Sequence, residues 1–261
     1  MDLEELARDD DRPLHQQLAD ALRRAMGTGS LRPNDRVPGE NTLMQRYGVS
    51  RWTSREALAT LASEGLITKV PKVGTFVRER PNVQRRGLER YARSRWQGQN
   101  AKTILSTEAT EQGTEASRII RELAEVSAPE NVSQRLDTPP KTLVWTRKRT
   151  ALLNGRPSQL ADSYYPLDVV EGTALLAAET GPGGDFARLD EAGHTPTRIR
   201  EEWQARMPTA LETADLQLPQ GTPVLDFIRT IFDQQGRPVE VMLSVIAADT
   251  ASFVYDFPIP D

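Results

Sequence analysis

Residues 47–76, YGVSRWTSREALATLASEGLITKVPKVGTF, constrain the fold of this chain more than any other stretch. Ser50 is a favourable N-cap, because its hydroxyl accepts a hydrogen bond from a free backbone N–H of the first helical turn. We therefore predict a helix that begins near Arg51 and ends before Gly65, since glycine is common just past a helix C-terminus. Its apolar face consists of residues at helical spacing: Ala57, Leu58 and Leu61.

The first half of this helix is polar and carries Arg51, Thr53, Ser54 and Arg55. The recognition helix of a DNA-binding protein presents its N-terminal side chains to base edges in the major groove. Arginine makes bidentate contacts to guanine there, and threonine contacts the thymine methyl group. The alternative is an ordinary amphipathic helix with a solvated basic end, and the neighbouring sequence decides between the two.

The residues that follow the helix favour a two-stranded ribbon, or wing. Leu66–Lys69 and Gly74–Val77 are short runs with strand-like composition on either side of a turn at residues 70–73. Lys69 and Lys72 are therefore placed to contact DNA phosphates.

Two further helices are expected before residue 47. Pro13 suits the first turn of a helix that ends at Gly27. A second helix of about eight residues is expected from Glu40, and Gly48 forms the turn into the third. This order of helix, short helix, turn, helix and ribbon is that of a winged helix-turn-helix, which we place at residues 12–78.

The charge of the chain is divided into blocks. Residues 1–11 carry a net charge of −5, residues 12–95 of +10 and residues 96–261 of −9, within a total of −4. A basic block in an otherwise acidic protein indicates a DNA-binding module attached to a domain that does not bind DNA.

Composition excludes several classes of site. The chain has no cysteine and only two histidines, His15 and His194, so a disulfide framework, a cysteine nucleophile and a His- or Cys-rich metal site are excluded. We expect no metal and no cofactor. Because no run of about 20 apolar residues and no signal-like N-terminal segment occur, we expect a cytoplasmic protein without a membrane partner.

The C-terminal half is expected to be an antiparallel sheet with helices, an α+β domain at residues 100–257. Asn154 and Gly155 lie between two runs of alternating apolar residues, a strong hairpin signal. Residues 103–105 favour the start of a strand and residues 115–125 a short helix. The basic residues 79–99, with proline and glycine as helix breakers, are expected to be a linker with a short helix, in which Tyr91 and Trp96 are candidates to pack against the following domain.

The first half resembles the DNA-binding domain of the GntR family of bacterial transcription regulators. The resemblance extends from Pro13 to Val77 and includes Tyr47–Arg51, Thr53, Arg55 and Gly74–Val77. It implies that Arg51, Thr53 and Arg55 read or clamp DNA and that the wing, with Gly74 and Thr75, contacts the minor groove. This chain departs from the family at Gly39 and Asn41, where serine and arginine are usual, and at Lys72, where the wing usually has glycine.

The second half resembles the UTRA effector domain of the HutC branch of this family, a domain with the fold of chorismate lyase. The resemblance includes Arg147 and Arg149, the run Ser163–Pro166, Arg229 and Glu240. It implies a pocket for a small effector. A catalytic role is the less favoured alternative, because His194 is the only histidine of this half.

The candidate pocket residues also fit one another chemically. Residues two apart on a strand project from the same face, so Arg147 and Arg149 form one pair and Ser163 and Tyr165 another. Guanidinium groups suit a phosphate or carboxylate, and we expect a polar pocket for an anionic or hydroxylated effector, completed by Arg229 and Glu240. A salt-bridged sheet face without a ligand is the alternative.

These observations predict a homodimeric transcription regulator, expected to be a repressor, that binds an inverted-repeat DNA operator and responds to a small molecule. Two-fold symmetry of the protein is expected to be mirrored in its operator. A DNA-binding protein whose C-terminal domain only dimerises is the alternative from another functional class.

Overall fold

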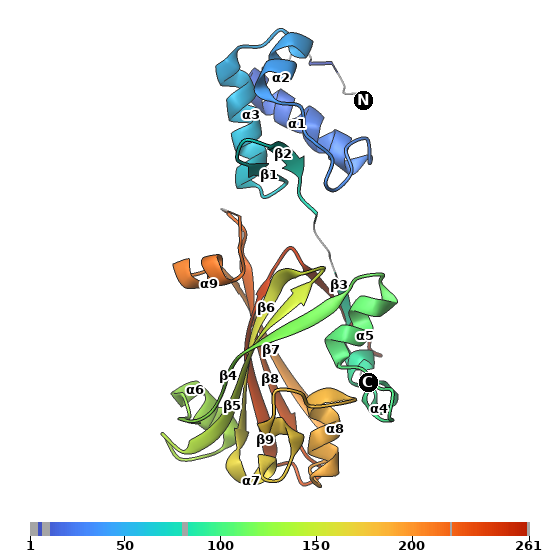
Figure 1. Cartoon of the computed structure of the whole chain (residues 1–261), viewed down its shortest axis with the longest axis vertical. Coiled ribbons are helices and arrows are strands. Elements are labelled where there is room, and N and C mark those ends of the chain that lie inside the picture. Colours follow the sequence, from blue (N-terminus) through green and yellow to red (C-terminus); the bar gives the residue numbers. More distant parts are fainter. Residues whose placement is uncertain (1–4, 7–10, 80–82, 220, 260–261) are drawn as a thin grey trace. The chain divides into compact units, whose positions relative to one another are not determined.

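The computed structural model in Figure 1 describes residues 5–6, 11–79, 83–219 and 221–259. It contains two compact units, one of residues 1–80 with 218–222 and one of residues 81–217 with 223–261. Across the described residues, every helix is too short or too polar to span a bilayer.

The N-terminal unit contains the predicted three helices and ribbon. They are α1 (Leu14–Gly27), α2 (Glu40–Tyr47), α3 (Arg51–Ser63), β1 (Ile67–Val70) and β2 (Gly74–Val77). The predicted cap is confirmed, because Ser50 Oγ accepts a hydrogen bond from Thr53 N at 3.1 Å. The three helices share one core that includes Leu18, Leu22, Leu43 and Leu61, all fully buried.

The wing is a tight antiparallel ribbon, with partners from Ile67↔Val77 to Val70↔Gly74. Lys72 lies in its turn with φ of 61°. This left-handed conformation costs a residue other than glycine roughly 1–2 kcal/mol. A left-handed residue at this place is the reason why glycine would be favoured there, and in this chain lysine adopts that conformation.

The second unit is built on a six-stranded antiparallel sheet with the strand order β4-β5-β6-β9-β8-β7. The strands are β4 (Ala116–Ser127), β5 (Leu143–Leu153), β6 (Arg156–Pro166), β7 (Arg198–Arg206), β8 (Val224–Phe232) and β9 (Pro238–Ala247). The predicted β5–β6 hairpin is confirmed, with Asn154 at φ of 49° and Gly155 at 74°, as a type I′ turn requires.

Helices cover both faces of this sheet, which confirms the α+β class (Figure 1). On one face, α8 (Gly184–Glu191) packs Phe186 and Leu189 against the sheet. On the opposite face, Val132 and Leu136 of α6 (Glu130–Leu136) pack against it. Other helical elements of this unit are α5 (Ile104–Glu111), α7 (Leu167–Val170), η2 (Ala174–Leu176) and α9 (Ala210–Asp215).

From Val83 on, the expected linker is instead part of the second unit, whereas the expected short helix and the packing of Trp96 are present. β3 (Val83–Arg86) pairs in parallel with β10 (Ala251–Val254), outside the main sheet, and η1 (Leu88–Tyr91) and α4 (Arg93–Trp96) follow it. Val83 is fully buried and Trp96 is 1 % exposed. Burial of these apolar side chains makes the stretch part of the second unit.

Residues 103–127 also differ from the expectation. Residues 104–111 form helix α5 where a strand start was expected, and residues 116–127 form strand β4 where a short helix was expected. β4 pairs with β5 along almost its whole length, interrupted by one irregularity between Ile120 and Glu122. Tertiary pairing with β5 therefore outweighs the local pattern of the β4 sequence.

Candidate functional site

The leading end of α3 carries the candidate DNA-reading side chains. Arg51 and Arg55 are exposed, as a base-contacting role requires. Thr53 is mostly buried and Ser54 is fully buried. The Ser54 hydroxyl donates to the Ser50 carbonyl at 3.3 Å, so this side chain faces the core and is removed from the candidate DNA contacts.

Thr53 has a local partner as well. Its Oγ1 lies 2.9 Å from Ser50 Oγ, within the cap of α3. Thr53 therefore stabilises the N-terminus of α3. Arg51 Nη2 donates to Asn41 Oδ1 at 3.4 Å, so the residue that stands in place of the family's arginine contacts the recognition helix.

The wing presents its basic residues to solvent. Lys69 and Lys72 are exposed, and Gly74 and Thr75 are half-buried. The Thr75 carbonyl accepts from Val37 N at 2.8 Å, which ties β2 to the segment before α2. Lys69 and Lys72 are therefore free to contact DNA phosphates, while this hydrogen bond fixes strand β2.

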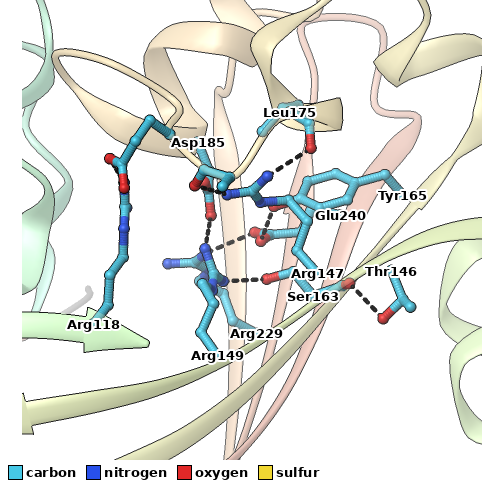
Figure 2. Close-up of polar contacts among 12 residues, drawn as sticks. Arg118, Thr146, Arg147, Arg149, Ser163, Tyr165, Leu175, Asp185, Arg229 and Glu240 are labelled. Atoms are coloured by element: carbon cyan, nitrogen blue, oxygen red, sulfur yellow. Dashed lines mark hydrogen bonds and ion pairs between the residues drawn. The ribbon is translucent and has the colours of Figure 1, made fainter. Parts of the chain in front are cut away.

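In the second unit, the predicted pocket residues gather on one face of the sheet (Figure 2). Strand register explains this, because Arg147 pairs with Ser163, and Ser163 with Met242 of β9. Arg149 donates to Ser163 Oγ at 2.6 Å and to Asp185 Oδ2 at 2.6 Å. Burial alone raises the pKa of the Asp185 carboxyl, but the charges of Arg149 and Arg147 bring it well below its usual range.

A second set of contacts joins β6, β8 and β9. The Tyr165 hydroxyl donates to Glu240 Oε1 at 2.9 Å, and Arg229 Nη2 donates to Glu240 Oε2 at 2.7 Å. Burial raises the pKa of Tyr165, so it stays a neutral hydrogen-bond donor near neutral pH. Glu240 is fully buried and its two oxygens serve these two donors.

Arg147 binds the segment of residues 175–178, which precedes α8. Its guanidinium donates to the carbonyl of Leu175 at 2.7 Å, to that of Ala177, and to that of Ala178 at 3.3 Å. The segment then leads to α8, where Asp185 meets Arg149. Arg147 therefore has a structural role in positioning Asp185.

Beside this cluster lies a cavity of about 360 Å³. Its charged and amide lining residues are Arg85, Arg90, Lys102, Arg118, Arg149, Gln159, Asp185 and Arg229. Of the six predicted pocket residues, only Arg149 and Arg229 line it. Arg147, Ser163, Tyr165 and Glu240 do not line it, and Ser163 and Glu240 instead accept hydrogen bonds from the lining residues Arg149 and Arg229 (Figure 2).

Arg85 is one of several lining residues that sequence reasoning missed. It projects from β3, is 2 % exposed, and donates from Nη2 to Gln159 Oε1 at 2.8 Å. Its Nε has no hydrogen-bond partner, whereas the nearby Arg90 forms an ion pair with Glu108. Burial, together with the like charge of Arg90, lowers the pKa of Arg85 to about 10. The signal for it was the basic run at residues 85–95, interpreted there as a linker.

The cavity is chemically suited to an anion. Six of its lining side chains are cationic and one is a carboxylate. A buried guanidinium without a carboxylate partner is unfavourable, and a bound anion removes that cost. Among the described residues no cluster of three or more acidic, histidine or cysteine side chains could hold a metal. His194 contacts Asp233 at 3.0 Å and does not line the cavity.

Comparison with known proteins accounts for both units. Residues 14–77 match the family described as bacterial regulatory proteins, gntR family, and residues 111–252 match the UTRA domain. A transcriptional regulator of the HTH type from Streptomyces coelicolor is 30 % identical over 253 residues, which cover 95 % of this chain and 94 % of that protein.

The chain belongs to the GntR family of bacterial regulatory proteins.

Other relatives of this GntR-family regulator are named as repressors. The mannosyl-D-glycerate transport/metabolism system repressor MngR of Escherichia coli is 26 % identical, over 93 % of this chain and 95 % of that protein. The repressor NagR of Bacillus subtilis is 24 % identical, over 93 % and 94 %. The family and these relatives are transcriptional regulators, not enzymes, and GntR-family regulators bind DNA and small-molecule effectors through these two domains.

Solved structures agree with the assignment. The crystal structure of a GntR-family transcriptional regulator is 31 % identical with a TM-score of 0.59, covering 96 % of this chain and 99 % of that one. PhnF from Mycobacterium smegmatis, at 21 % identity, has the same fold with a TM-score of 0.59, over 93 % and 100 %. The predicted family and fold class are confirmed.

Proposed function

We propose that this GntR-family regulator is a homodimeric repressor that binds an inverted-repeat operator in the cytoplasm and is released by an anionic small molecule. The observation that carries the DNA-binding part is the pair of exposed arginines, Arg51 and Arg55, on the leading end of a capped helix that is followed by a basic wing. The repressors among the relatives support the direction of regulation.

The proposed effector site is the cavity lined by Arg85, Arg149 and Arg229. Arg149 and Arg229 already have carboxylate partners in Asp185 and Glu240, whereas the buried Arg85 donates to the Gln159 amide and lies over the Phe253 ring, so its charge is the more available for an anion. An anion in the cavity would gain charge-assisted hydrogen bonds from a desolvated guanidinium, which are stronger than those of neutral donors.

The position of Arg85 in the chain suggests how a ligand would act. Arg85 lies five residues after Arg80, the last residue of the continuous part of the first unit. A ligand that holds β3 would restrict the short connection between the units. It can shift operator affinity only if it binds one arrangement of the two winged helices better than another.

Selection from a pool of random duplexes tests the DNA-binding proposal. The purified full chain is mixed with the pool, and the retained duplexes are sequenced. We expect a palindrome with two half-sites, because a two-fold symmetric dimer reads both strands alike. Retention of unrelated sequences at low salt, without a shared motif, would contradict the proposal.

Arg85→Met tests the effector proposal. Phosphate and sulfate are expected to raise the melting temperature of the unaltered chain beyond the effect of chloride at equal ionic strength. In Arg85→Met this difference is expected to fall to the general stabilisation that sulfate and phosphate give by exclusion from protein surfaces, while the anion-free melting temperature is kept or raised because a buried charge is gone. Arg86→Met, at an exposed neighbour on the same strand, is the matched control and should keep the response. If phosphate and sulfate raised the melting temperature of Arg85→Met as much as that of the unaltered chain, Arg85 would not be part of the anion site.

Lys72→Ala tests the wing. If Lys72 contacts a phosphate, the variant should bind all duplexes more weakly and show a salt dependence (log K against log salt) that is lower by about 1. Binding to the selected operator and to an unrelated duplex is measured between low and moderate salt. A loss confined to one base position would instead identify Lys72 as a base-reading residue.

A further inference from the structure

Trp52 is an exposed tryptophan on the recognition helix. Its side chain is 57 % exposed, whereas Trp96 is 1 % exposed and Trp145 and Trp203 are partly buried. A single exposed apolar residue is common on protein surfaces and by itself indicates nothing. The position of Trp52 is informative, because it directly follows Arg51 and precedes Arg55 by three residues in the first turns of α3.

The exposed residues of the first turns of α3 are Arg51, Trp52 and Arg55, while Thr53 and Ser54 face the core. Residues three and four apart on a helix are neighbours on its surface, so Arg55 borders both Arg51 and Trp52. A helix that places Arg51 and Arg55 in the major groove therefore places Trp52 there as well. The sequence alone had predicted a DNA contact for Ser54, but the structure exposes Trp52 and buries Ser54.

The indole is also held in position. The ring of His15, at the start of α1, meets the Trp52 ring edge-on, with 5.5 Å between centroids and 75° between planes. Edge-to-face aromatic pairs are favourable beyond their buried area. Trp52 thus keeps an orientation that leaves more than half of its surface free, and a pre-oriented side chain loses less entropy when a ligand covers it.

We propose that Trp52 is a specificity-determining residue that packs against a thymine methyl group next to the bases contacted by Arg51 or Arg55. This inference rests on the proposed DNA-binding function. The thymine C5-methyl group is the one apolar feature that base pairs present in the major groove, and apolar side chains contact it there. A large rigid indole beside the Arg55 guanidinium would favour thymine at a defined place in each half-site, with His15 as its positioning residue.

The test combines protein variants with DNA that lacks single methyl groups. The palindrome selected by the full chain is made with each thymine in turn replaced by uracil, which removes only the methyl group. We expect one uracil position per half-site to weaken binding of the unaltered protein. Trp52→Ala should weaken binding to the thymine operator about 5- to 30-fold, in the range of one mismatched base pair, and should bind the uracil operator no more weakly than the thymine operator.

Further variants separate contact from folding. Trp52→Phe keeps an aromatic surface and should retain the thymine preference in part, and His15→Ala should reduce it without changing the salt dependence of binding. Indole fluorescence of the full chain should change when the operator binds, and this change should be absent in Trp52→Phe. If Trp52→Ala selects the same palindrome with the same affinity, this inference is overturned while the proposed function stands. If the unaltered chain selects no motif, both are overturned.

Discussion

Glu240→Ala is expected to destabilise the effector domain by about 3–5 kcal/mol, the usual cost of removing one partner from a buried ion pair. Glu240 is fully buried and accepts from both Arg229 and Tyr165. Without it, the guanidinium of Arg229 and the fully buried Tyr165 hydroxyl lose their shared acceptor. An unpaired buried charge costs far more than the net gain of the original hydrogen bonds.

Urea unfolding measures this effect in a Trp52→Phe background, where the remaining tryptophans, Trp96, Trp145 and Trp203, all belong to the second unit. The matched control is Asp168→Ala, which removes the partner of Arg237 from an exposed ion pair. Exposed pairs contribute about 0–1 kcal/mol, so the control should unfold close to the parent protein. Equal unfolding midpoints for Glu240→Ala and Asp168→Ala would contradict a stabilising role for this cluster.

Arg51→Ala and Arg55→Ala are each expected to weaken operator binding by about 1–3 kcal/mol, the discrimination supplied by one bidentate contact to guanine. Both guanidinium groups are exposed at the leading end of α3, and a methyl group in either place can make no such contact. The loss should concern the selected operator far more than an unrelated duplex, because base contacts rather than phosphate contacts are removed.

Titration of labelled operator and unrelated duplex at one fixed salt concentration gives the two free energies. Arg86→Ala removes an equally exposed arginine from the second unit, and it controls for the loss of one positive charge. Unchanged operator affinity in both α3 variants would remove these residues from the interface. An equal loss on both duplexes would instead assign them to phosphates.

Local sequence was sufficient where the structure depends on neighbouring residues. Ser50 as the cap of α3, Asn154 and Gly155 as the hairpin turn, and Gly48 between α2 and α3 are each determined by backbone chemistry within a few residues. The alternation of strand side chains correctly placed Arg147 with Arg149 and Ser163 with Tyr165 on one face. The fold class and the gathering of the polar cluster could be predicted for this reason.

Local sequence could not predict the structure of the basic run at residues 85–95. Its charges are the same whether they are solvated in a linker or desolvated in a domain, and composition favoured the linker. Parallel pairing of β3 with β10, which lies more than 160 residues later in the chain, buries Arg85 and brings it to the cavity. Such pairing leaves no signal within either strand.

The sequence by itself therefore determined the winged helix-turn-helix, the hairpin and the residue types that could bind an anion, because capping, turn geometry and side-chain alternation act over a few residues. Only the tertiary structure decided that Ser54 faces the core while Trp52 faces solvent, and that Arg85 rather than Arg147 offers its charge to the cavity. The physical reason is burial, which depends on what packs against a side chain and not on its neighbours in the chain.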